Sequence, residues 1–117
     1  MSDTIQEMYI KARKAFREIE FWPQERVDEM VAAVGWEFQK PSTAQALARL
    51  AVDESGIGVY EDKVAKIQNK TRGVMRDLIG EKTCGLIRED KEKGLRIFAK
   101  PVGVIANVVP CTNPEST

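Results

Sequence analysis

The residues best placed to do chemistry follow an apolar run near the end of the sequence. Val102–Val109 is interrupted only by Asn107, and Val109-Pro110-Cys111-Thr112-Asn113-Pro114 comes directly after it. Such a run is typical of a strand buried on both faces of a parallel sheet. Ligands of open α/β sheets bind beyond the carboxyl ends of the strands. The sequence therefore predicts that Val109, Pro110, Cys111 and Thr112 line a ligand site.

Residue types limit the chemistry that this loop can do alone. Asn113 precedes Pro114, and this pair is typical of a helix N-cap before a proline at the first helical position. Residue types alone therefore favour a capping role for Asn113. The chain has no histidine, so a Ser-His or Cys-His nucleophile pair is excluded within it. His-containing zinc sites are excluded as well, and two cysteines are too few for a thiolate site. We predict no metal site.

Composition describes an ordinary globular protein of one small domain. The 117 residues carry 18 Lys plus Arg and 18 Asp plus Glu, so net charge gives no general attraction to nucleic acid or to an anionic membrane. No apolar run is long enough to span a membrane, and the N-terminus lacks a secretory pattern. Two cysteines form no disulfide framework. We predict a reduced, cytoplasmic setting.

The elements that must position this loop begin with four helices over residues 1–80. Ser2 or Asp3 is expected to cap the first, whose apolar residues share one face. Pro23 suits the first turn of the second helix, and Gly35 within it indicates close helix packing. The stripe of the first helix is Ile5, Met8, Tyr9, Ala12, Phe16 and Ile19, and that of the second is Val27, Met30, Val31, Val34 and Phe38.

Prolines and glycines mark the next two helices and a change of period. The third is predicted from Pro41-Ser42-Thr43 to a stop at Gly56, and the fourth from Glu61 or Asp62 to Gly80. Residues 81–100 then read as a β-hairpin, with strands Gly85–Arg88 and Leu95–Ala99 around a charged turn. In its second strand Leu95, Ile97 and Ala99 alternate with Arg96, Phe98 and Lys100. This alternation predicts one buried and one exposed face. Residues 101–117 would supply one parallel-type strand and its loop.

Two segments of the chain together resemble the aldehyde dehydrogenase superfamily, and most closely its CoA-acylating branch, which also forms the N-terminal half of bifunctional aldehyde-alcohol dehydrogenases. The first runs from Ala51 through Ser55-Gly56-Ile57-Gly58 and Glu61-Asp62-Lys63 to Lys70. It is similar to the Glu-Thr-Gly-x-Gly, Glu-Asp-Lys and Lys-Asn pattern of the branch. The second, Lys100–Thr117, is similar to the family's Pro-x-Gly-Val-Ile-x-x-x-Val-Pro-x-Thr-Asn-Pro. Cys84-Gly85-Leu86-Ile87 and the hairpin match in order and spacing.

The resemblance implies an α/β parent fold with a Rossmann-type cofactor domain, of which this chain would be an N-terminal fragment. The parent would convert a small aldehyde, CoA and NAD or NADP into acyl-CoA and reduced cofactor through a cysteine thioester. Asn113 would match the family's oxyanion-hole asparagine, and the backbone of Val109, Pro110, Cys111 and Thr112 would line the nicotinamide groove. The nucleophilic cysteine lies much further along in the family, so Cys111 is read as a small side chain beside the cofactor, and Cys84 as a buried apolar residue.

The resemblance also leaves choices open. Ser55 replaces a threonine, Ile67-Gln68-Asn69 departs from the Lys-Asn pattern, and Glu115 stands where a small or hydroxyl residue is usual. The aldehyde, the choice of NAD or NADP, a fused alcohol dehydrogenase domain and a microcompartment location stay undecided. We expect the isolated chain to be inactive and the parent to be a homo-oligomer. Two alternatives remain, a non-catalytic assembly module and a helical domain unrelated to dehydrogenases.

Overall fold

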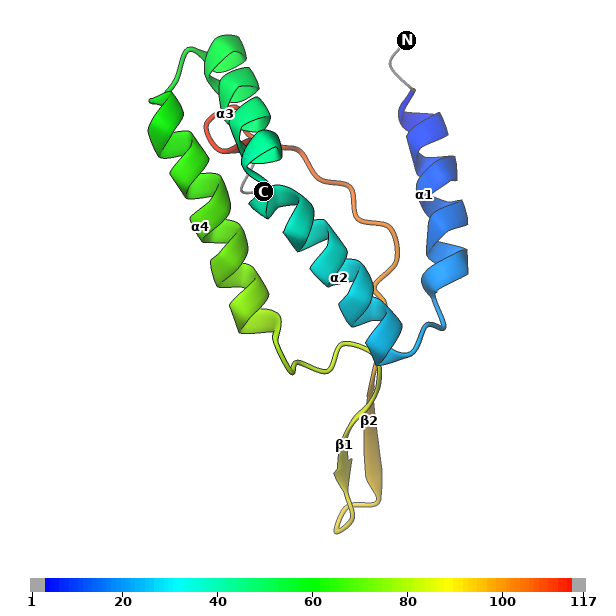
Figure 1. Ribbon diagram of the computed structural model, residues 1–117. Helices are drawn as coiled ribbons and strands as arrows, with labels where there is room; N and C mark the ends of the chain where they lie inside the picture. Colours follow the sequence, from blue (N-terminus) through cyan, green and yellow to red (C-terminus); the bar gives the residue numbers. More distant parts are fainter. Residues whose placement is uncertain (1–3, 115–117) are drawn as a thin grey trace. The chain divides into compact units, whose positions relative to one another are not determined.

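The computed structural model describes residues 4–114, which form four helices and one β-hairpin (Figure 1). The helices are α1 (Ile5–Ile19), α2 (Gln24–Gln39), α3 (Pro41–Ser55) and α4 (Tyr60–Leu78), and the strands are β1 (Gly85–Asp90) and β2 (Leu95–Ala99). Their order and approximate bounds confirm the prediction of four helices followed by a hairpin. No helix in this part of the chain is long and apolar enough to cross a membrane.

The chain divides into two compact units. One comprises Met1–Val27 with Lys82–Asn107, and the other comprises Asp28–Glu81 with Val108–Thr117. The first holds α1, the beginning of α2 and the hairpin. The second holds the rest of α2, α3, α4 and the loop after residue 107. This division places the predicted site loop in the unit built from helices.

Helix α1 in the first unit has its N-cap one or two residues later than the sequence suggested. Thr4 is its N-cap, and the Thr4 hydroxyl accepts from the Glu7 amide while the Glu7 carboxylate accepts from the Thr4 amide at 2.7 Å. This capping box satisfies two helix-end donors, and it makes Thr4 the cap in place of Ser2 or Asp3, which lie outside the described residues. The two hydrogen bonds from Thr4 hold the pKa of Glu7 below its usual value of 4.5.

The hairpin in the same unit is held at its base by the first residue of α2. The side-chain oxygen Oε1 of Gln24 accepts from the Thr83 amide at 2.8 Å and from the Cys84 amide at 3.1 Å. The strands pair antiparallel from Gly85↔Ala99 to Asp90↔Leu95, with an irregularity between Leu86 and Arg88. Leu95, Ile97 and Phe98 are all exposed, so the prediction of one buried face is wrong. No described element covers either face of the ribbon, and Cys84 at its base is half-buried.

A small core between α3 and α4 holds the second unit together. Ala44 and Ala48 of α3 meet Ile67 of α4, and all three are buried. The side chains packed against them are partly buried; they are Phe38, Leu47, Tyr60 and Val64. Alanines at both α3 positions let the helix backbones approach closely around the larger isoleucine.

Helix α2 also packs against α4, as the glycine at position 35 suggested. A Cβ added to the buried Gly35 would lie 2.7 Å from Met75 Cγ. One turn later, Gln39 Nε2 donates to the Gln68 carbonyl at 2.7 Å and Gln68 Nε2 donates to the Gln39 carbonyl at 3.0 Å. These reciprocal bonds fix the longitudinal position of α2 along α4. Pro23 precedes the first helical residue of α2, and its carbonyl accepts from the Val27 amide.

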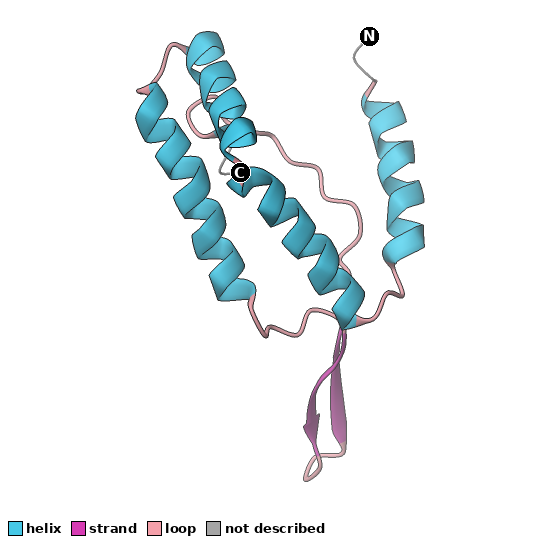
Figure 2. Cartoon of the chain, in the orientation of Figure 1, coloured by secondary structure: helices cyan, strands magenta, loops and turns pink. Residues whose placement is uncertain are grey.

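The predicted strand at Val102–Val109 is not formed. Figure 2 draws the chain after β2 as loop, and the only described sheet has two strands. A strand exists through ladder hydrogen bonds to a neighbour, and no described strand pairs with this segment. The Rossmann-type sheet expected from the resemblance is therefore not seen in residues 4–114.

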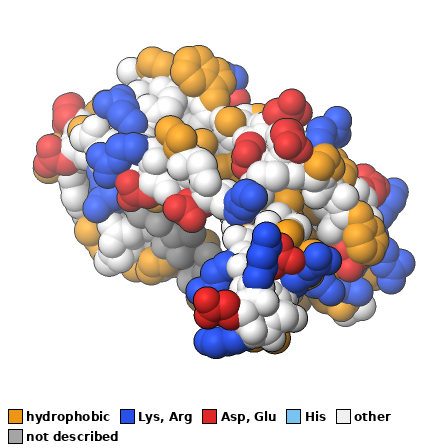
Figure 3. All heavy atoms as spheres, turned by 90° about the horizontal axis from the view of Figure 1, so that it is seen from below, with side chains coloured by type: hydrophobic (Ala, Val, Ile, Leu, Met, Phe, Trp, Pro, Cys, Tyr) orange, Lys and Arg blue, Asp and Glu red, His pale blue; other side chains and the backbone are white. Residues whose placement is uncertain are grey.

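Charged side chains of both signs are interspersed over the face seen in Figure 3, with hydrophobic side chains between them. This mixture agrees with the zero net charge of the chain. An extended nucleic-acid-binding surface would require a continuous basic patch. This face does not have one.

Candidate functional site

The predicted site residues lie in an exposed loop near the end of the described chain. Val109, Pro110, Cys111, Thr112 and Asn113 are exposed, and Pro114, the last described residue, is half-buried with a helical conformation. Asn113 directly precedes it, which is the position that a capping residue would take. Glu115 lies outside the described residues.

The N-terminal end of helix α4 contacts this loop, and a short segment with two glycines, Gly56 and Gly58, precedes that end. Gly56 has φ 65° and Gly58 has φ 88°, and both values favour glycine because a side chain clashes with the backbone there. Gly56 ends α3 through its amide, which donates to the Val52 carbonyl at 2.8 Å. Glu61 and Asp62 then occupy the first turn of α4, where acidic side chains interact favourably with the helix dipole.

Two lysines of α4 bind the loop. Lys63 Nζ donates to the Thr112 carbonyl at 3.3 Å, and Lys66 Nζ donates to Asn113 Oδ1 at 2.8 Å. The lysines are three residues apart, a spacing that puts them on the same side of a helix. The structure thus joins two segments that are about fifty residues apart in the sequence, and both carry the resemblance described above.

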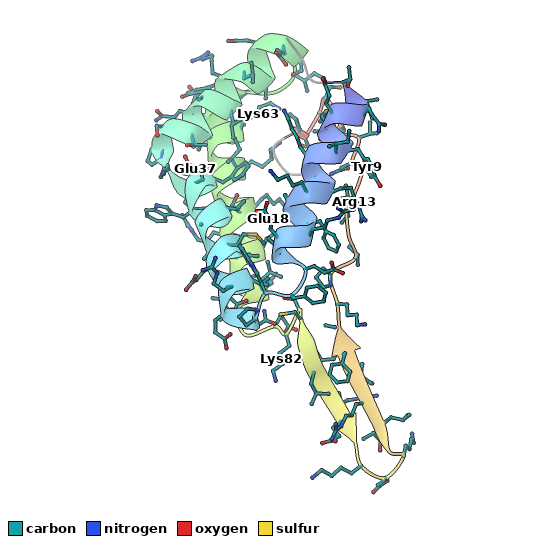
Figure 4. The ribbon with its side chains drawn as sticks, turned by 90° about the vertical axis from the view of Figure 1, so that its right-hand side faces the viewer. Tyr9, Arg13, Glu18, Glu37, Lys63 and Lys82 are labelled. Atoms are coloured by element: carbon teal, nitrogen blue, oxygen red, sulfur yellow. The ribbon has the colours of Figure 1, made fainter. Side chains whose placement is uncertain are left out.

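Lys63 is unusual because only 4% of it is exposed. It comes from the first turns of α4 (Figure 4). A buried lysine needs a hydrogen-bond partner for its ammonium group, and the Thr112 carbonyl is one. Gly58 leaves room for the lysine stem, because a Cβ at Gly58 would lie 3.1 Å from Lys63 Cε.

The contact with Lys66 determines which way the Asn113 amide faces. A lysine ammonium has three donors and no acceptor, so it must meet the amide oxygen and not the amide nitrogen. Asn113 Nδ2 lies on the other side of the amide group, 3.5 Å from Thr112 Oγ1. The amide therefore presents N–H donors away from the lysine.

A shallow hollow open to solvent lies where the loop meets α4. It is lined by Ile57, Gly58, Val59, Asp62, Lys63, Lys66, Thr112 and Asn113. Of the predicted site residues, Thr112 and Asn113 border the hollow, whereas Val109, Pro110 and Cys111 do not. Cys84 and Cys111 are free thiols. Residues 4–114 contain no group of three or more possible metal ligands. The lining of the hollow mixes apolar, acidic, basic and amide side chains.

Lys63 and Lys66 are the site residues that the sequence did not single out. Lys63 belonged to the Glu61-Asp62-Lys63 pattern, but that pattern gave it no role. The available signal was the three-residue spacing of two lysines after a glycine-rich turn. That signal is weak, because lysines at this spacing usually lie on solvated helix faces.

Known proteins match this chain along nearly its whole length, although no family model does. A sulfoacetaldehyde dehydrogenase of an Acholeplasma species is 46% identical over 110 residues, which are 93% of this chain and 23% of the relative. The acetylating succinate-semialdehyde dehydrogenase of Clostridium kluyveri is 40% identical over 97% of this chain and 25% of the relative. The bifunctional aldehyde-alcohol dehydrogenase of Escherichia coli K12 is 38% identical over 92% of this chain and 12% of the relative. The chain thus spans a quarter or less of these relatives.

Proposed function

Since the homologues of this chain are acylating aldehyde dehydrogenases, which it matches over their N-terminal part, we propose that it serves as the N-terminal part of such an enzyme. The enzyme would convert an aldehyde, CoA and NAD(P)+ into acyl-CoA and NAD(P)H. The observation that carries this proposal is the similarity at 38–40% identity over 92–97% of the chain to a succinate-semialdehyde and an aldehyde-alcohol dehydrogenase.

Asn113 is the residue that we assign to the reaction. When a cysteine thiolate attacks an aldehyde, negative charge develops on the former carbonyl oxygen, and a fixed N–H donor stabilises that charge. The Asn113 Nδ2 group is such a donor, because Lys66 holds the amide oxygen. The nucleophilic cysteine would come from the remainder of the enzyme, and exposed Cys111 would act only as a small side chain beside the cofactor.

The loop before Asn113 also suits a nicotinamide cofactor. Its residues Val109–Thr112 are exposed, carry no carboxylate and offer main-chain donors and acceptors, which are groups that cofactor sites use. These residues would hold the nicotinamide end, and the bound cofactor would accept a hydride from the substrate. CoA, a small aldehyde, the rest of the enzyme and a second copy of the subunit are the proposed partners. A cytoplasmic location stays a prediction.

A kinetic assay of the complete enzyme that carries this chain tests the proposal. Aldehyde, CoA and NAD+ or NADP+ should give NAD(P)H and acyl-CoA in equal amounts. Asn113→Ala should lower kcat about 100- to 1000-fold, the usual effect of removing an oxyanion donor. Asn69→Ala, which changes an exposed asparagine of α4, is the matched control and should leave kcat unchanged. CoA-independent turnover, or full activity of the Asn113 variant, would overturn the assignment.

A second candidate function, a non-catalytic assembly module, is favoured by the uncovered apolar surface. The first-unit side chains Ile5, Met8, Leu95 and Phe98 are all exposed, and such surface is typical of protein interfaces. Size-exclusion chromatography with light scattering of the 117-residue chain separates the two candidates. One defined oligomer favours the module, whereas a heterogeneous aggregate favours a chain that needs the rest of an enzyme.

A further inference from the structure

We propose that Lys66 is a positioning residue for the Asn113 amide, and that Lys63 anchors the same loop through the Thr112 carbonyl. This inference rests on the proposed role of Asn113 and adds two residues to it. The two lysines act on consecutive residues, one on the main chain at 3.3 Å and one on the side chain at 2.8 Å. Together they fix both the path of the loop and the rotation of the amide.

The rotation matters because an asparagine amide has two different ends. Rotation of the terminal torsion by half a turn exchanges Oδ1 and Nδ2 with little steric change. In one orientation the amide donates to an oxyanion, and in the other its oxygen repels that anion. Lys66 selects the donating orientation because its ammonium group accepts no hydrogen bond. An enzyme gains from a donor that is already oriented when charge develops.

The charge of Lys66 adds a second effect. An ammonium group on the amide oxygen polarises the amide, and hydrogen bonds in a chain strengthen one another. This effect, like the orientation, acts through the Asn113 amide, and it grows along the reaction because the aldehyde oxygen gains charge only as the cysteine attacks. Loss of Lys66 should therefore lower kcat more than it changes KM.

Lys63 is buried and has a different role from Lys66. Its burial and its hydrogen bond hold the Thr112 carbonyl against α4, so that the peptide leading to Asn113 has one position. Gly58 permits this arrangement, since any side chain there would press on Lys63 Cε. Gly58 is therefore expected to act on the loop through Lys63.

Kinetics of lysine variants in the complete enzyme test the role of Lys66. Lys66→Met keeps the length of the side chain and removes both donor and charge. It should lower kcat about 10- to 100-fold, a part of the full oxyanion-donor effect, with KM for aldehyde changed less than about threefold. Lys66→Arg should restore most of kcat, because arginine also donates and never accepts. Lys70→Met removes an exposed lysine one turn further along α4 and should leave both constants unchanged.

A double-mutant cycle separates failure of this inference from failure of the proposed function. In the Asn113→Ala background, Lys66→Met should have almost no further effect on kcat, because the group that it positions is gone. If Asn113→Ala itself has no effect, the proposed function fails. If Asn113→Ala is damaging and Lys66→Met is not, or if the two losses multiply, the positioning role is overturned.

NMR of the 117-residue chain gives a readout that needs no activity. The side-chain amide resonances of Asn113 should shift in Lys66→Met and stay in place in Lys70→Met. Unchanged Asn113 resonances in Lys66→Met would show that the contact does not orient the amide, and would overturn the inference.

Discussion

Replacement of Ile67 by alanine should strongly destabilise the helical unit. Ile67 is 1% exposed and is the largest fully buried side chain described, and it packs between Ala44 and Ala48 of α3. Deleting a buried isoleucine to alanine costs about 2–5 kcal/mol, and the cost rises with the cavity that remains. The α3 neighbours are alanines and cannot extend into the space, so a value of about 3–4 kcal/mol is expected. Alanine's better helix propensity returns only about 0.4 kcal/mol.

Urea unfolding followed by circular dichroism at 222 nm measures this loss. Ile67→Val should cost about 1 kcal/mol, because valine leaves a smaller cavity. Val74→Ala on the same helix is the control, since Val74 is 58% exposed. Its free energy of unfolding should stay within about 0.5 kcal/mol of that of the unsubstituted chain. A cost below about 1 kcal/mol for Ile67→Ala, or an equal cost for Val74→Ala, would refute the assignment of the core to the α3–α4 contact.

The same substitution should also affect the site. Ile67 follows Lys66 directly and is four residues after Lys63, so a looser α3–α4 contact moves both lysines. The Asn113 side-chain resonances should therefore broaden in Ile67→Ala and not in Val74→Ala.

Three further predictions concern the helix ends and the cysteines. Gly56→Ala should destabilise the chain by about 1 kcal/mol in urea unfolding, because Gly56 has a positive φ. Glu7 has a lowered pKa, so its contribution to α1 is present above pH 4.5 and is lost as pH falls through the lowered value. Amide NMR should show α1 fraying there, and Glu7→Gln, which has no carboxylate to titrate, should remove this pH dependence. Cys111→Ser should keep kcat of the complete enzyme within about tenfold of the parent, because Cys111 is not assigned as the nucleophile.

Features set by local chemistry could be predicted from the sequence. Gly56 ends α3 as expected, because a glycine adopts positive φ without strain wherever it follows a helix. The hairpin was also predictable, since alternating apolar runs around Gly94 need only each other to form a ladder. Gly35 signalled close packing correctly, although Met75 as its neighbour could not be named.

Features set by distant partners could not be predicted. Val102–Val109 has the composition of a buried strand, but composition does not supply the neighbouring strand that pairing requires. The alternating pattern of β2 likewise indicates a face that could be buried without showing what covers it. The contacts of Lys63 and Lys66 join residues 47–49 positions apart. No local pattern distinguishes these lysines from solvated ones.

The structure indicates that the site loop is held from the helical side and not by a strand before it. Val102 is 86% exposed and Val108 is 94% exposed, so the segment leading into the loop has little packing. Residues 108–114 nevertheless group with the helical unit, and hydrogen bonds from Lys63 and Lys66 hold the loop against α4. A sheet completed by the rest of the proposed enzyme would then fix the same loop from its other end. The Asn113 amide would be oriented by α4 before that sheet forms, so loss of Lys66 should disturb Asn113 in the short chain as well as in the complete enzyme.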